Sequence, residues 1–411
     1  MAALLLTNAN VLDPDRGVIL EDHHVLIEDE RIREVSDRPL RSESAETVDL
    51  GGRTLMPGLI DAHVHVALTT MDLAGMTRKP AMLVAIEAAA IMKRMLHRGF
   101  TTVRDAAGAV RGLAMAVERG LVEGPRLFYA GRALSQTGGH GDFRPLEDQP
   151  TVCPCAVFTS GISHVADGLA SVRAAAREEL RQGSSQVKIM ASGGVASPSD
   201  PIWNVQYSAE EMRAIVEEAQ GWRTYAMAHA YTPEAITRAV EAGVRTIEHG
   251  NLIDEPTARL MAGRGAFLVP TLVTYFKIDE LGRQLGMPAA SMRKVGDVLD
   301  AGLTSLERCR DAGVAMGFGT DLLGETHDAQ SEEFTIRARV LPPADVIRSA
   351  TTVNAEILGK AGELGVVAAG AVADLLVVDG DPLRDVSVLT GQGEHLPGIL
   401  QNGRWVVNRL G

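Results

Sequence analysis

Two histidines one residue apart, His63 and His65, are the residues of this chain whose types and spacing most clearly suggest chemistry. They follow the apolar run 56–62, which has the composition of a buried strand. Side chains two positions apart on a strand point to the same side, so both imidazoles can reach one metal ion. Neutral imidazoles that face the interior are costly to bury without a partner, and a divalent metal is the usual one. The motif alone is short enough to occur by chance.

Four further candidates lie within or just after other apolar runs, and they are Lys188, His229, His249 and Asp321. Lys188 lies inside its run, the two histidines end theirs, and Asp321 follows Gly319-Thr320. Each has an ordinary alternative: an exposed or snorkelling lysine, a hydrogen-bonded core histidine, or a helix-capping aspartate. Six residues of ligand type at such positions are hard to attribute to chance, so the sequence predicts that they meet at one site.

Eight strand-like runs alternate with helical patterns through residues 57–360, which predicts a (β/α)8 barrel of the TIM type in an α/β protein. The runs end near residues 63, 104, 130, 190, 229, 249, 270 and 318. Helix starts are marked by the capping box Ser208–Glu211 and by Thr232-Pro233. In such a barrel the active site lies at the carboxyl ends of the strands, where the candidates above fall.

The two ends of the chain have a different character. Residues 1–56 contain short β runs separated by turns, and residues 361–411 repeat that pattern, with a hairpin signal at Asn402-Gly403. We expect both ends to form one small β-sandwich domain, with the barrel inserted between them. The N-terminus reads as a first strand and not as a signal peptide, because it has no basic region.

Composition narrows the function classes. The 411 residues are 45% hydrophobic with a formal net charge of -13 and no long basic run, which argues against a nucleic-acid partner. No stretch is long and apolar enough for a membrane helix. Three cysteines cannot form a disulfide framework, which favours the cytoplasm, and Cys153 and Cys155 lack the partners of a structural zinc site.

Over nearly its whole length the chain resembles the amidohydrolase superfamily. The resemblance rests on Pro57-Gly58-Leu-Ile-Asp-Ala-His63-Val-His65, Lys188, His229, Ile247-Glu-His249-Gly, Gly319-Thr-Asp321 and the returning segment Gly370-Ala-Val-Ala-Asp374. It is most similar to the imidazolonepropionase-like group, which includes binuclear dipeptidases and prolidases and relatives that open ochratoxin-type amides. The resemblance implies a homo-oligomer, with octamers among the relatives.

The same resemblance implies two zinc ions, although other divalent metals suit such a site. His63, His65 and Asp321 would hold one metal, His229 and His249 the other, and a carboxylated Lys188 and a hydroxide would bridge them. Asp321 would accept the proton of the attacking hydroxide and deliver it to the leaving amine. A heterocycle deaminase is an alternative, but such enzymes have a glutamate three residues after the histidine that matches His229, and Thr232 occupies that position.

Substrate recognition is expected in the loops. His140 lies in the glycine-rich segment 135–142, and Tyr231 follows His229; related dipeptidases use a histidine and a tyrosine at these places. Ser192 begins a similar loop, and His164 lies with Arg144 in a long segment that is a candidate lid. We expect a hydrolase that cleaves the amide bond to the C-terminal amino acid of a dipeptide or N-acyl amino acid, ochratoxin A included. A cyclic-amide hydrolase and a non-enzymatic relative are the alternatives.

Overall fold

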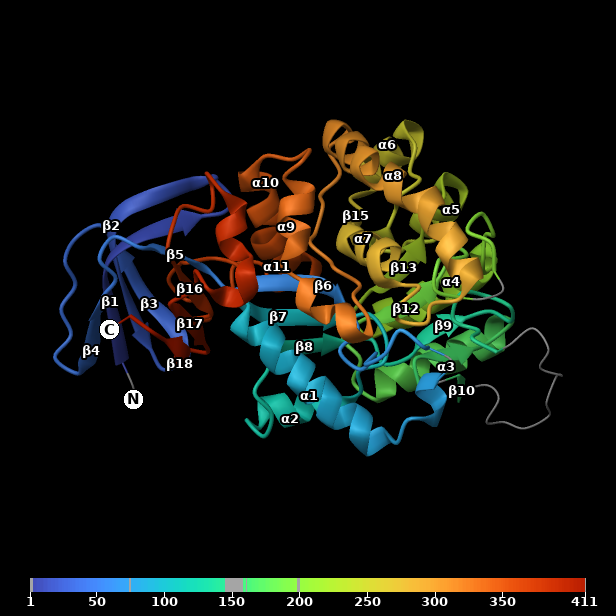
Figure 1. The fold of residues 1–411 in the computed structure, drawn as a ribbon, viewed down its shortest axis with the longest axis horizontal. Coiled ribbons are helices and arrows are strands. Elements are labelled where there is room, and N and C mark those ends of the chain that lie inside the picture. Colours follow the sequence, from blue (N-terminus) through green and yellow to red (C-terminus); the bar gives the residue numbers. More distant parts are fainter. Residues whose placement is uncertain (1–2, 74, 145–157, 160, 198–199, 411) are drawn as a thin grey trace.

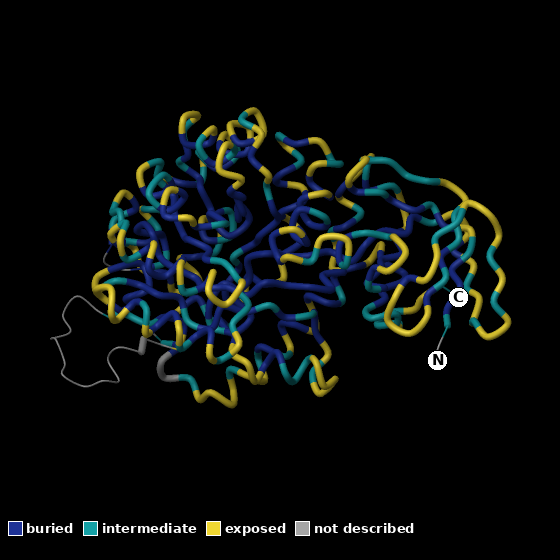
Figure 2. Tube along the Cα trace, turned by 180° about the vertical axis from the view of Figure 1, so that it is seen from behind, coloured by how far each residue is buried: buried dark blue, intermediate teal, exposed yellow. Residues whose placement is uncertain are grey.

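The computed structural model describes residues 3–73, 75–144, 158–159, 161–197 and 200–410. Cys153, Cys155 and the other residues of 145–157 and 160, which are part of the candidate lid, lie outside these residues. Figure 1 shows a smaller β-sheet part, built from the blue and red ends of the chain, beside a larger part in which helices surround strands. The buried residues concentrate along the strands of the larger part, whereas the exposed ones follow its outer helices and loops (Figure 2).

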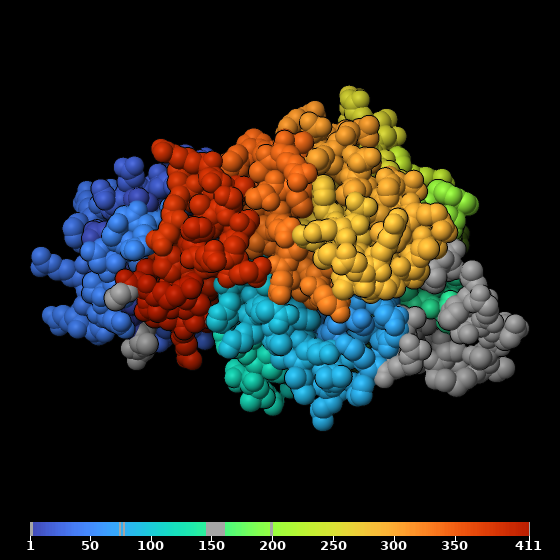
Figure 3. Space-filling model, in the orientation of Figure 1, coloured from blue at the N-terminus to red at the C-terminus, as the bar shows by residue number. Residues whose placement is uncertain are grey.

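The two ends of the chain share one mixed sheet in the order β18-β17-β16-β5-β1-β2-β3, with β4 beside β1. The link between the ends is the antiparallel pair of β16 and β5, in which Leu376 faces Met56. The two chain ends thus join in one sheet, as predicted. These described strands form a single sheet, whereas the predicted β-sandwich would have two. Its strands are β1 (Ala3–Asp13), β2 (Val18–Glu28), β3 (Arg31–Ser36), β4 (Ala45–Asp49), β5 (Thr54–Pro57), β16 (Leu375–Val378), β17 (Gly398–Gln401) and β18 (Arg404–Asn408). Figure 3 shows the C-terminal residues on the surface between the N-terminal strands and the larger part.

The larger part contains two sheets that are parallel except for the pair β10 and β11. One has the order β6-β7-β8, and the other has the order β10-β11-β9-β12-β13-β14-β15. The strands are β6 (Leu59–Val64), β7 (Phe100–Asp105), β8 (Arg126–Tyr129), β9 (Ala133–Ser135), β10 (Phe158–Thr159), β11 (Ser163–Val165), β12 (Val187–Met190), β13 (Ala226–Ala230), β14 (Thr246–His249) and β15 (Phe267–Val269). Most are buried along their whole length, as parallel strands covered by helices are.

The run that ends near Phe318 connects the two sheets. The backbone N–H of Leu268 in β15 donates to the carbonyl of Ala315 at 3.0 Å, and Ala62 in β6 donates to the carbonyl of Phe318 at 2.8 Å. The expected eighth strand is thus represented by an isolated parallel bridge between Leu268 and Met316. The α/β class is confirmed, and a closed eight-stranded barrel stays a prediction because the described strands form two sheets.

Helices cover the outside of these sheets (Figure 1). The capping box at Ser208 and the N-cap at Thr232 are present as predicted. None of the helices in the described residues is long and apolar enough to span a membrane. The α-helices are α1 (Ala81–His97), α2 (Arg111–Glu118), α3 (Leu169–Arg181), α4 (Ala209–Gly221), α5 (Pro233–Glu241), α6 (Glu255–Arg264), α7 (Leu272–Leu281), α8 (Ala289–Ala312), α9 (Glu332–Arg337), α10 (Pro343–Arg348) and α11 (Asn354–Ile357). Short 3-10 or π turns occupy Gly75–Arg78, Gly324–Ala329, Ser349–Val353, Val386–Leu389 and Gly391–Gly393.

Candidate metal centre and substrate pocket

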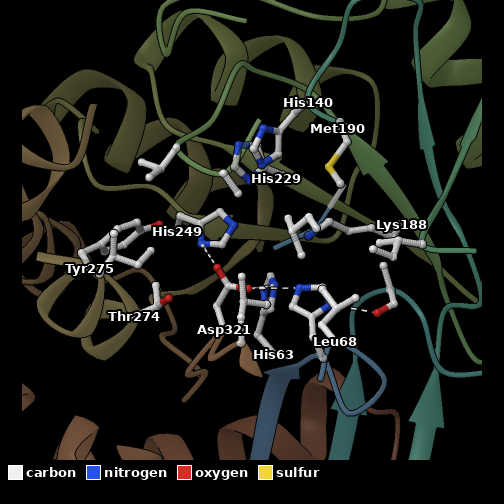
Figure 4. A pocket seen from close by; sticks show the side chains of 18 of the residues that line it. His63, Leu68, His140, Lys188, Met190, His229, His249, Thr274, Tyr275 and Asp321 are labelled. Carbon is white, nitrogen blue, oxygen red and sulfur yellow. Dashed lines mark hydrogen bonds and ion pairs between the residues drawn. The ribbon is translucent and has the colours of Figure 1, made fainter. Parts of the chain in front are cut away.

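One cavity at the carboxyl ends of the parallel strands collects the side chains that the sequence singled out as metal ligands. β6 and the residue that follows it bring His63 and His65, β12 brings the lysine, β13 and β14 bring one histidine each, and the loop after Phe318 brings the aspartate. Figure 4 shows His63, His249 and Asp321 pointing toward one another, with His229 and Lys188 around them. The ligand candidates that line the cavity are His63, His65, Lys188, His229, His249 and Asp321.

Asp321 is the centre of this arrangement. Its Oδ1 is 3.0 Å from His65 Nε2 and 3.5 Å from His63 Nε2, and its Oδ2 is 4.0 Å from His249 Nδ1. One ligand atom from each of His63, His249 and Asp321 lies within 4.8 Å of the other two. Three donor groups this close together have the spacing that a single metal ion requires.

The backbone is strained at two of these residues. His249 has a φ of 75° and Asp321 a φ of 53°, in the left-handed region that residues with a side chain rarely adopt. Such conformations cost on the order of 1–3 kcal/mol each and collect where side chains must be aimed at a site. Both strained residues line the cavity, and their backbone conformation sets the direction in which their side chains enter it.

His229 joins the same cluster through its ring. The ring centroids of His229 and His249 are 4.6 Å apart, and those of His63 and His249 are 4.9 Å apart. His229 Nε2 lies 3.1 Å from the carbonyl oxygen of Gly193, in the loop after β12. The structure thus brings together the imidazoles expected for both metal positions.

Burial sets the charge of these groups. It lowers the pKa of His63, His229 and His249 well below the ordinary value, so these rings are neutral, the form that binds metals. Burial also lowers the pKa of Lys188 to about 8. Burial alone would raise the pKa of Asp321, but the imidazoles of His63 and His65 outweigh it, so that pKa is lowered and the group is a carboxylate.

The donor set fits a divalent metal of the zinc type. His63 Nε2 is buried and finds no hydrogen-bond partner among the described residues, which is costly for a polar atom unless an ion occupies the space beside it. Neutral imidazoles together with a carboxylate are the ligands that zinc prefers.

His140 lies against this cluster on the side of His229. The two rings stack with centroids 4.2 Å apart and planes 19° apart (Figure 4). His140 Nδ1 is 2.9 Å from Ser197 Oγ, and the ring packs against Gly194, where a Cβ atom would come within 2.2 Å of the imidazole. Only glycine fits at position 194, and the ring is held in one orientation.

A lysine from a distant helix holds the loop that carries these contacts. Lys294 in α8 donates from Nζ to the carbonyl oxygens of Gly194 and Ser197 at 2.9 Å and of Asp200 at 2.5 Å. Asp200 is itself buried, and its Oδ2 accepts from Gln206 Nε2 at 2.9 Å. Lys294 was not predicted from the sequence, because nothing in its helical context signals three carbonyl partners.

Tyr231 lines the cavity and is paired with a second phenol. The hydroxyls of Tyr231 and Tyr275 are 2.8 Å apart, and burial raises the pKa of both, so both stay protonated. Ser192 Oγ accepts from the backbone N–H of Tyr231 at 3.1 Å and therefore helps to fix the backbone of that residue. Tyr275 and its neighbour Thr274 belong to α7 and were not predicted; an aromatic residue in an apolar helix gives no signal of such a role.

His164 lies apart from the cluster. It lines a separate hollow with Arg111, Arg132 and Glu178, beside α2 and α3. The rest of the main cavity is apolar, and its lining is Leu68, Leu73, Ala107, Phe143, Ile162, Met190, Val195, Ala196, Ile278 and Leu323.

Comparisons with known proteins find relatives along nearly the whole chain. Ochratoxinase of Aspergillus niger is 30% identical over 406 residues, which cover 94% of this chain and 83% of that protein. Imidazolonepropionase of Deinococcus radiodurans is 26% identical over 407 residues, 92% of each chain. The crystal structure of a prolidase complexed with N-methylphosphonate-L-proline is 55% identical, covers 99% of this chain and 100% of that one, and superposes with a TM-score of 0.97.

The model of the amidohydrolase family matches residues 54–406, which include every residue of the candidate site. That match spans the returning strands of the small sheet as well as the larger part, and it confirms the resemblance drawn from the motifs. The chain therefore belongs to the amidohydrolase family.

Proposed function

We propose that this protein is a metal-dependent dipeptidase of the prolidase type, which cleaves the amide bond before a C-terminal amino acid. The observation that carries the proposal is the convergence of neutral imidazoles, Lys188 and Asp321 in one buried cavity. The 55% identity to a prolidase complexed with a phosphonate of L-proline favours proline as the leaving residue.

The residues present suit two zinc ions. His63, His65 and Asp321 would hold one, His229 and His249 the other, and Lys188, carboxylated on Nζ, would contribute to both. When bound, the metals would supply Lewis-acid polarisation of the scissile carbonyl and a water acidic enough to ionise near neutral pH. Carboxylation turns the Lys188 cation into an anion, which removes the repulsion that an ammonium would exert on two dications.

Asp321 is the proposed proton carrier. Its carboxylate is ionised and lies at the centre of the imidazole cluster, so it can accept the proton of the attacking water at Oδ1 or Oδ2. It would then deliver that proton to the departing amine nitrogen, which an amide needs because an amide anion is a poor leaving group.

The phenols supply donors for the substrate. Tyr231 and Tyr275 are protonated and adjacent. One hydroxyl can therefore donate to a substrate oxygen while it accepts a hydrogen bond from the other hydroxyl. A substrate carboxylate beside this pair would receive hydrogen bonds of the charge-assisted kind. His140, fixed by its stack on His229, is the other polar group placed to contact the substrate.

The apolar lining favours uncharged substrate side chains. Among the described lining residues, Lys188 and Asp321 are the charged non-histidine side chains, and both belong to the metal cluster. A cationic or anionic substrate side chain would therefore lose its hydration without gaining a partner from these residues. Proline and aliphatic residues are the expected substrates.

The test is a substrate panel with zinc-loaded protein. It contains Xaa-Pro dipeptides, dipeptides with other C-terminal residues, ochratoxin A and 4-imidazolone-5-propionate, and kcat/KM is measured for each. We expect Xaa-Pro dipeptides with aliphatic first residues to give the highest values, and a chelator to abolish turnover. Turnover of the imidazolone without that of any linear amide would overturn the proposal in favour of the cyclic-amide alternative.

A further inference from the structure

A fully buried ion pair lies behind the candidate metal centre. Arg104 in β7 donates from Nη2 to both carboxylate oxygens of Glu248 in β14, at 3.0 and 3.1 Å, and neither side chain is exposed to solvent. Removing two charges from water costs as much as their attraction returns, so stability alone does not explain such a pair. Neither residue was among the predicted site residues.

Glu248 directs the ring of His63. Its Oε2 lies 2.7 Å from His63 Nδ1, and because both carboxylate oxygens also accept from Arg104 Nη2, we take Nδ1 as the donor of this hydrogen bond. The lone pair of the neutral ring is then on Nε2, the buried atom without a hydrogen-bond partner that faces Asp321. The carboxylate thus selects the tautomer whose free nitrogen points into the cluster.

Arg104 fastens both ends of this arrangement. While Nη2 holds Glu248, Nε donates to the carbonyl oxygen of Ala62, the residue before His63, at 2.6 Å. Nη1 lies 3.2 Å from Thr246 Oγ1, and that hydroxyl donates to Glu248 Oε1 at 2.5 Å. One guanidinium therefore fixes the strand that carries His63 and the carboxylate that orients its ring.

We propose that Glu248 and Arg104 are positioning residues that set the tautomer and orientation of His63 and thereby the affinity of the metal site. The inference rests on the proposed function only in that it assumes a metal at His63. Groups that hydrogen-bond the far nitrogen of a metal-binding histidine typically change metal affinity by about 10–100-fold when they are altered.

The experiment compares two isosteric variants of buried glutamates. Glu248→Gln keeps the shape but lets the amide donate, which removes the selection of the Nδ1–H tautomer. Glu333→Gln is the matched control, because Glu333 pairs with Arg337 at 2.6 Å with both side chains equally buried, in α9. Zinc dissociation constants are measured by competition with a chromogenic chelator, and the cobalt-substituted proteins are compared by visible absorption.

We expect Glu248→Gln to lose at least tenfold in zinc affinity with an altered cobalt spectrum, and Glu333→Gln to keep both. Wild-type affinity and spectrum in Glu248→Gln would overturn the proposal. If that variant does not fold, Thr246→Val removes only the hydroxyl that donates to Glu248, and a loss of a few-fold is expected from it, with no change again overturning the proposal. These readouts need no substrate, so they stand apart from a failure of the dipeptidase proposal.

Discussion

Asp321 has two proposed roles in the cavity, as a metal ligand and as the proton carrier. It lies within 4.0 Å of three imidazoles, adopts a positive φ and follows two residues after Gly319, where a Cβ atom would come within 2.8 Å of His63 Cβ. A carboxylate in this position can serve both as a ligand and as the group that moves the proton. The two roles can be separated, because an amide keeps one oxygen for binding but cannot exchange a proton.

Asp321→Asn is therefore expected to lower kcat at least a hundredfold while much of the metal stays bound, since loss of general acid–base catalysis typically costs 10²–10⁴. The measurement is kcat with an Xaa-Pro dipeptide together with zinc content by elemental analysis of the same sample. Near-normal turnover by the variant would contradict the role of Asp321 as proton carrier.

Tyr275 is expected to matter for binding the substrate carboxylate. Tyr275→Phe removes one hydroxyl of the phenol pair, and the loss of a hydrogen bond to a charged group, about 1.5 kcal/mol, corresponds to roughly a tenfold higher KM. The same comparison with the C-terminal amide of the dipeptide is the control. An equal effect on the acid and the amide would show that Tyr275 does not bind the carboxylate.

The sequence could locate the residues of the cluster because each stands in or just after an apolar strand, where a polar side chain is conspicuous. It could not locate Arg104, Glu248, Lys294 or Tyr275. Their partners come from other strands and helices, so their contacts depend on packing that no local pattern records. His164 was predicted to bind substrate because it lies in the same long segment as the candidate lid. The structure instead places it in a separate hollow, so position in the chain alone was a poor guide.

At the scale of elements, the loop after β12 depends on α8. Lys294 holds three carbonyls of this loop, and the loop in turn packs Gly194 against His140. The strand pattern was predicted from apolar runs, yet the run at 315–318 forms one bridge rather than a full strand. Periodicity cannot anticipate where the pairing of such a run stops.

Lys294→Met keeps the side-chain length but removes the charge and the three hydrogen bonds. We expect kcat/KM to fall about tenfold with unchanged zinc content, because His140 loses its fixed orientation while the metal ligands remain. Lys277→Met in α7 is the matched control, since both lysine side chains are 16% exposed and Lys277 pairs with Glu280 and Glu332 instead. Equal effects of the two substitutions on kcat/KM would contradict the proposal that Lys294 fixes His140 through the loop after β12.

At the scale of the whole molecule, the two chain ends form one sheet beside the larger part, and the strands of the larger part carry the residues of the cavity (Figure 1). The hairpin signal and the short β runs at each end are local features, so they could be recognised in the sequence. The pairing of β16 with β5 joins the two ends as predicted. The cavity concentrates buried titratable groups, and these tie the stability of the folded chain to pH. His327, in the turn Gly324–Ala329, is a further buried titratable group that does not line the cavity.

Burial lowers the pKa of His327 to about 4, and its Nε2–H donates to the carbonyl oxygen of Leu68 at 3.1 Å. As the pH falls below the ordinary value of 6.5, the unfolded chain binds this proton before the folded one does. The contribution to stability is therefore complete above pH 6.5 and lost by pH 4, a change on the order of 3 kcal/mol. His327→Gln keeps a donor for Leu68 and should flatten the acid side of the stability curve by that amount. Urea unfolding of the metal-free proteins between pH 4 and 7 measures the difference, and parallel curves for the two proteins would contradict it.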